Sequence, residues 1–107
     1  MVRVEVLRKW LNKLDEYLTI LNRLRRYSFE EFTADPERYG SAERFLQLVI
    51  EALIDLGNHV IADLRLGAVE WYSDIPRLLY EAGYVDAEMR ETWTRMIGFR
   101  NVLVRLP

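Results

Sequence analysis

The chain has 107 residues, of which 50% are hydrophobic and 30% are charged, and its formal net charge at pH 7 is −2. This length and balance are typical of one globular domain. We expect that domain to span residues 1–107 and to bury a hydrophobic core without covalent cross-links. The slight acidity excludes a general attraction to nucleic acid, so any such binding must rest on a local basic patch. The absence of cysteine excludes a thiolate nucleophile and a disulfide framework.

Targeting and cofactor signals are absent as well. Neither a long apolar run nor a signal-peptide core is found, so we expect a cytoplasmic protein that does not associate with a membrane. His59 is the only histidine, and Glu51 and Asp55 alone are a thin set of ligands, so no metal site is expected. No glycine-rich phosphate loop is present either, and no cofactor is expected.

Residues 4–26 are predicted to form a long amphipathic helix, because leucines recur at spacings of three and four. These leucines are Leu7, Leu11, Leu14, Leu18 and Leu21. The helix ends in Arg23, Arg25 and Arg26, charges that suit a helix C-terminus. They are interpreted as a solvated helix end, with a contact to RNA phosphates as the alternative.

The central helix is predicted at residues 41–64, with Ser41 as its N-cap. It is preceded by a short helical turn at residues 28–32, capped by Ser28, and by a loop at residues 33–40. Apolar residues cover most of its circumference, so other elements should cover it on several sides. One narrow polar line, which must face water, a basic neighbour or a partner, is formed by Gln47, Glu51, Asp55 and Asn58.

Residues 65–72 are expected to form a linker, in which Gly67 indicates the end of the central helix. Trp71 and Tyr72 in this linker are interpreted as covers over the edge of the core. A stacking platform for nucleobases is the alternative.

Two further helices are predicted towards the C-terminus. The first covers residues 73–82, is capped by Ser73 and is stopped by Gly83; the second runs from Ala87 to about Val104 and is capped by Asp86. Strand signals are absent. The fold class is therefore predicted to be all-α, an antiparallel bundle of four to five helices.

The last predicted helix carries a charge on its apolar seam. The seam, with spacings of four and three, consists of Met89, Trp93, Met96, Arg100 and Leu103. A guanidinium on such a face costs several kcal/mol unless it is paired. Arg100 is interpreted as half of an ion pair, with Glu51 or Asp55 as its first candidate mates; an active-site cation is the alternative.

His59 lies on the mostly apolar central helix and is interpreted as a hydrogen-bonded core residue. In the alternative, Asp55 accepts a hydrogen bond from it one turn earlier and holds it as a general base.

Three segments of the sequence carry a family resemblance. They are Ala-Glu-Arg-Phe-Leu-Gln-Leu at 42–48, the Glu51 to His59 segment with Asp-Leu-Gly-Asn-His at its end, and Met-Ile-Gly-Phe-Arg-Asn-Val-Leu-Val at 96–104. Together they resemble the HepT-like family of HEPN-domain proteins over nearly the whole chain. The resemblance implies a HEPN-like helical bundle, a homodimer and metal-independent RNA cleavage. It also implies a toxin whose partner is a minimal nucleotidyltransferase antitoxin and whose target is RNA or tRNA.

The active-site signature of that family is Arg-x4-His on the last long helix, with a polar residue commonly following the arginine. Histidine there handles the proton of the 2′-hydroxyl or leaving group, and arginine stabilises the charge of the phosphorane. Arg100 and Asn101 match the signature, whereas Arg105 stands where the family has histidine. Because a guanidinium cannot accept a proton at physiological pH, we expect RNA cleavage to be impaired.

Two further departures concern the end of the chain. The family often has a tyrosine in or just after the motif, but this chain has none there and stops at Pro107, where members continue for another helix or so. Together with Arg105, these departures suggest a degraded or frameshifted relative that keeps a binding role. Two alternatives remain: an active ribonuclease in which His59 has taken over proton transfer, and a plain helical interaction module.

Overall fold

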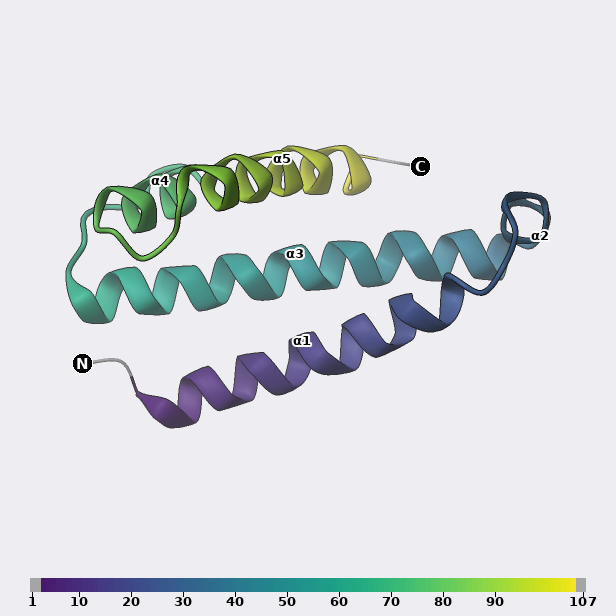
Figure 1. Ribbon diagram of the computed structural model, residues 1–107, viewed down its shortest axis with the longest axis horizontal. Helices are drawn as coiled ribbons and strands as arrows, with labels where there is room; N and C mark the ends of the chain where they lie inside the picture. Colours follow the sequence, from purple (N-terminus) through teal and green to yellow (C-terminus); the bar gives the residue numbers. More distant parts are fainter. Residues whose placement is uncertain (1–2, 106–107) are drawn as a thin grey trace.

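The computed structural model describes residues 3–105, and within this range it contains five helices and no strand. The helices are α1 (Val4–Leu24), α2 (Phe29–Ala34), α3 (Pro36–Leu64), α4 (Asp74–Glu81) and α5 (Ala87–Leu103). Figure 1 shows α1 and α5 running antiparallel to α3, on opposite sides of it. The predicted all-α antiparallel bundle is confirmed.

Helix α3 occupies the middle of the bundle and contributes to two hydrophobic clusters. On the side of α1, Leu14 is buried against Val49 and Ala52. On the side of α4 and α5, the buried residues are Ile50, Ile54, Ile61, Ile75, Leu78, Leu79, Trp93 and Ile97. Leu53 packs against both clusters. The prediction of a central helix covered on several sides is therefore confirmed.

Gly57 permits the closest approach between α3 and the C-terminal helices. A Cβ atom built there would lie 3.2 Å from two ring carbons of Trp93 and would collide with Cγ2 of Ile75. Any larger side chain at this position would push α4 and α5 away from α3, so the glycine sets the distance between these layers.

The start of α3 differs from the prediction. The segment 33–40 is not a loop: α3 begins at Pro36, and Ser41 lies inside it. Asp35 is the N-cap, and its carboxylate accepts a hydrogen bond of 2.9 Å from the amide N–H of Glu37. An acidic cap followed by proline at the first helical position is a favourable helix start, so Asp35-Pro36 is a start signal rather than a loop signal. Gly40 is tolerated within the helix.

The other predicted helix ends have mixed outcomes. The Ser28 cap is confirmed as a capping box, and the Asp86 carboxylate accepts from the N–H of Met89 as predicted. Ser73 occupies the predicted N-cap position of α4, but its side chain makes no capping hydrogen bond. Helix α3 ends at Leu64, as predicted, and its C-cap Arg65, two residues before Gly67, adopts the left-handed conformation with φ 53°.

The apolar seam predicted on α5 is also partly wrong. Trp93 and Leu103 are buried, but Met89 is half exposed, and Ile97 takes a core position instead.

By length and composition α3 could also cross a membrane, a criterion that core helices of soluble proteins meet as well.

Candidate functional site

Arg100 on α5 forms an ion pair with Glu51 on α3. The Nη2 atom of Arg100 lies 3.5 Å from Oε1 of Glu51, and 21% of the Arg100 side chain is exposed. Gln47 donates a second hydrogen bond to the same carboxylate oxygen, at 3.0 Å. Of the two candidate mates, the structure therefore selects Glu51; Asp55 is exposed one turn further along α3. The predicted pair and the partial burial of Arg100 are confirmed.

The Arg100 guanidinium has two further neighbours. Its Nη1 atom donates to Oδ1 of Asn101 at 3.3 Å, and its Cζ lies 5.2 Å from the ring centroid of Tyr72. Within residues 3–105 its Nε–H is buried without an acceptor. The glutamate, the amide and the aromatic ring thus hold the cation in one orientation.

A hollow of about 470 Å³ opens between α5 and the loop that precedes α4. It is lined by Trp71, Tyr72, Ser73, Thr94, Ile97, Gly98 and Asn101. Its wall combines two aromatic rings with hydroxyl and amide groups. Arg100 is not among the lining residues but contacts two of them, Tyr72 and Asn101. Such a wall can receive a planar ligand that carries a negative charge.

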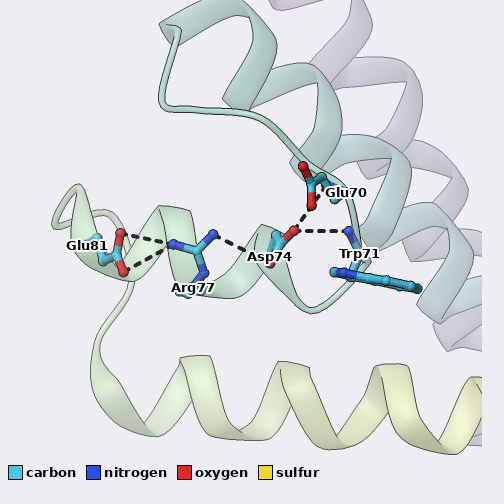
Figure 2. Close-up of polar contacts among 5 residues, drawn as sticks. All are labelled: Glu70, Trp71, Asp74, Arg77 and Glu81. Atoms are coloured by element: carbon cyan, nitrogen blue, oxygen red, sulfur yellow. Dashed lines mark hydrogen bonds and ion pairs between the residues drawn. The ribbon is translucent and has the colours of Figure 1, made fainter.

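Asp74 holds the loop that forms one side of this hollow. Its Oδ2 atom accepts hydrogen bonds of 3.0 Å from the backbone N–H groups of Glu70 and Trp71, while Arg77 pairs with its other oxygen at 3.5 Å (Figure 2). The backbone hydrogen bond from Trp71 is the main cause that lowers the pKa of Asp74, followed by the one from Glu70. The sequence pattern did not predict this role, because the Asp74 carboxylate accepts from backbone N–H groups that precede the helix and not from those of its first turn.

Arg105 follows the C-cap Val104 and is exposed. Its backbone N–H donates to the carbonyl of Val102 at 3.1 Å, and no ion pair within the described segment involves its side chain. The position at which the family resemblance implies histidine therefore holds a solvated guanidinium.

His59 lies on a different surface from Arg100. It is exposed, so its interpretation as a core residue is wrong. With Asp55, it lines a hollow of about 500 Å³ whose remaining wall is Trp10, Asn58 and Ala62. No hydrogen bond joins Asp55 to His59 in the described part of the chain.

The separation follows from helix geometry. His59 comes eight residues after Glu51 on α3, which corresponds to about 12 Å along a helix with a rise of 1.5 Å per residue. One chain therefore does not bring the imidazole beside Arg100. Between residues 3 and 105 there is also no cluster of three or more histidine, aspartate or glutamate side chains arranged to hold a metal.

Two arginines contact Tyr27: Arg26, which follows the end of α1, and Arg38 of α3. Arg26 donates to the Tyr27 hydroxyl at 2.7 Å, and Arg38 lies over the same ring with its Cζ 3.9 Å from the centroid. The hydrogen bond from Arg26 is the main cause that lowers the pKa of Tyr27. Arg23 and Arg25 are exposed, in keeping with a solvated helix end.

Two solved structures share this fold. One is a crystal structure of a toxin–antitoxin with AMP-PNP, which has a TM-score of 0.89 and 20% sequence identity over 95% of this chain and 76% of that chain. The other is a crystal structure of a mutant of the toxin–antitoxin MntA-HpeT, with a TM-score of 0.79 and 24% identity over 90% of this chain and 77% of that chain. A comparison with curated protein sequences gave no significant match.

The family described as Ribonuclease HepT-like matches residues 14–106. This match includes all the residues of the candidate site, and it agrees with the resemblance carried by residues 42–48, 51–59 and 96–104. The chain belongs to the HepT-like family.

Proposed function

We propose that this chain is the HEPN component of a toxin–antitoxin pair, that it binds RNA through the surface around Arg100 and Asn101, and that its ability to cleave RNA is impaired. Membership of the HepT-like family supports the first part. The structures of similar fold are described as toxin–antitoxin, which supports an antitoxin as the partner. That this antitoxin is a minimal nucleotidyltransferase is what the family resemblance implies.

The observation that carries the proposal is the state of the Arg100 guanidinium. It is held by Glu51 and Asn101 and lies against Tyr72. Tyr72 and Asn101 line an open hollow, so a phosphate bound there would be near a donor that can contact its oxygens. Only part of the charge of Arg100 is compensated, because the Glu51 contact is a single one at 3.5 Å.

The impairment follows from the missing base. Arg105 supplies no group that can accept a proton at neutral pH, and the hollow that contains His59 is separate from the one lined by Tyr72 and Asn101. General acid–base catalysis typically contributes about 10²- to 10⁴-fold to a rate. Without it, cleavage by an Arg100–Asn101 site should stay near background.

A second candidate function is that of an interaction module without enzymatic activity. An apolar groove of about 320 Å³ between α3 and α5 favours it; the groove is lined by Leu46, Val49, Ile50, Thr92, Arg95, Met96 and Phe99. An exposed apolar surface of this kind is typical of contacts between chains. In this case RNA binding would be absent, and assembly with the antitoxin or with a second copy would be the whole function.

Two measurements on the pure protein test the proposal. The first is cleavage of total RNA beside Arg100→Ala: we expect background cleavage by both proteins, and robust cleavage by the unmodified chain that is lost in Arg100→Ala would contradict the impairment. A further loss in His59→Ala would then identify His59 as the substitute base. The second is binding of single-stranded RNA, which Arg100→Gln should weaken. An unmodified chain that binds no RNA would favour the interaction module.

A further inference from the structure

Trp71 is the most exposed tryptophan of the chain, with 73% of its surface accessible. It lies outside both hydrophobic clusters, so its interpretation as a cover over the core is wrong. A tryptophan side chain carries a large apolar area that proteins ordinarily bury or place in an interface. Nothing in the packing of α4 and α5 therefore accounts for this ring.

The backbone that carries the ring is fixed. The backbone N–H of Trp71 donates to the Asp74 carboxylate at 3.0 Å, and the backbone carbonyl of Trp71 accepts from the backbone N–H of Asp74 at 2.9 Å. Figure 2 shows the indole extending away from this clamp. An exposed ring on a held backbone loses little conformational entropy when a ligand stacks on it.

The surroundings of the ring have the chemistry of a nucleobase site. Tyr72 adds a second, half-exposed aromatic ring, with Arg100 against it. Asn101, among the lining residues, can hydrogen-bond the edge of a base. Gly98 leaves the wall open on α5, since a Cβ atom there would have no neighbour within 4 Å.

We propose that Trp71, Tyr72 and Asn101 form a subsite that stacks a nucleobase of single-stranded RNA, next to a phosphate that contacts Arg100. This inference rests on the proposed RNA binding and adds the part of the ligand that the loop before α4 recognises. Stacking on aromatic side chains is how proteins bind unpaired bases, and it tolerates different sequences because every base has a π face. A cation beside the rings favours a nucleotide over an uncharged apolar ligand.

The test is the affinity of the full chain for two fluorescent oligonucleotides at one salt concentration. One is a short 2′-O-methylated RNA, which cannot be cleaved through its 2′-oxygen; the other has the same backbone with abasic positions in its middle. The variants are Trp71→Ala, Trp71→Phe and Arg100→Gln. Phe29→Ala is the matched control, because Phe29 is 81% exposed on α2 and lies outside the hollow.

We expect Trp71→Ala to weaken binding of the base-containing RNA about tenfold and Trp71→Phe to weaken it less, as stacking on one ring predicts. The abasic oligonucleotide should bind the unmodified chain about tenfold more weakly, with little further loss in Trp71→Ala. Arg100→Gln should weaken both oligonucleotides by a similar factor. Phe29→Ala should change neither.

Different results overturn different statements. If Trp71→Ala behaves like Phe29→Ala while Arg100→Gln still weakens binding, the subsite is wrong and the proposed function stands. If the unmodified chain binds neither oligonucleotide, both are wrong. If Trp71→Ala changes the oligomeric state in sedimentation but leaves the RNA affinity unchanged, the ring belongs to a contact between two copies of the chain. That result contradicts the subsite. Equal affinity of the unmodified chain for both oligonucleotides rejects stacking even if a variant fails to fold.

Discussion

Gly57 of α3 lies against the indole of Trp93, so close that a Cβ atom at position 57 would be 3.2 Å from two ring carbons. We therefore expect Gly57→Ala to destabilise the fold by roughly 1–3 kcal/mol, as overpacking of a filled core typically does. Urea unfolding followed by tryptophan fluorescence measures the change. Gly40→Ala is the matched control: it lies in the same helix with nothing within 4 Å of its added methyl group. It should stabilise the protein by up to about 1 kcal/mol, and equal effects of the two substitutions would contradict this account.

The Arg100–Glu51 pair predicts different effects on stability for two substitutions of Arg100. Arg100→Leu should be close to neutral for stability, because an apolar side chain on a partly buried seam replaces the pair with packing. Arg100→Ala should cost roughly 1–3 kcal/mol, since it leaves a cavity and a partly buried carboxylate without its cation. Both are measured as free energies of unfolding, with Arg105→Ala as the exposed control. If Arg100→Leu were as destabilising as Arg100→Ala, the pair would contribute more than its geometry indicates.

The lowered pKa of the Asp74 carboxyl predicts that the stability of the fold depends on pH. The backbone hydrogen bonds from Trp71 and Glu70 lower its pKa below that of the unfolded chain. The stabilisation is therefore present above the ordinary pKa of an aspartate and is lost as the pH falls through the lowered pKa of the folded state. Asp74→Ala should lower the melting temperature at neutral pH, and the difference from the unmodified protein should shrink in acid. A difference that is constant with pH would show that the carboxylate charge is not what holds the loop.

The C-terminal half of α5 predicts a twofold dimer. Phe99 and Val102 on this helix, and Val104 directly after it, are each about half exposed. The apolar groove adjoins them at Phe99. Burial of this surface between two copies would bring two Arg100 side chains towards one cleft. Sedimentation at tens of micromolar should show a dimer, and Phe99→Asp should yield a monomer. Leu11→Asp, at an exposed apolar position on α1, is the control that should leave the dimer intact; a monomeric unmodified chain would refute this prediction.

Arg105→His tests whether the missing base limits catalysis. We expect the substitution to restore a trace of RNA cleavage, because an imidazole can accept a proton near neutral pH. The double variant Arg100→Ala, Arg105→His should lose that trace. If cleavage in the single variant survives the additional change at position 100, it does not depend on this site.

The helices could be predicted from the sequence because their periodicity is strong, whereas one boundary and several contacts could not. Asp35-Pro36 is compatible with either a turn or a helix start, and only the course of α3 decides between them. Glu51 and Asp55 both lie on the same polar line; the position of α5 selects Glu51. For His59, the line of polar residues continues further along α3 than expected, which places the imidazole outside the core. The exposure of Trp71 could not be predicted, because the clamp formed by Asp74 acts through backbone groups that carry no sequence signal.

The two clusters on opposite sides of α3 also have a consequence for local opening of the fold. Helix α1 packs on α3 through the smaller cluster, in which Leu14 is buried and Trp10, Tyr17 and Leu21 are partly buried. Helices α4 and α5 pack on α3 through the larger cluster around Ile61 and Ile75. We therefore expect α1 to be a separate cooperative unit that detaches while the other helices remain folded. In native-state hydrogen exchange, its amides should exchange through an opening that costs less than global unfolding. A protease that cuts transiently opened segments should accordingly remove α1 first and leave α3, α4 and α5 together.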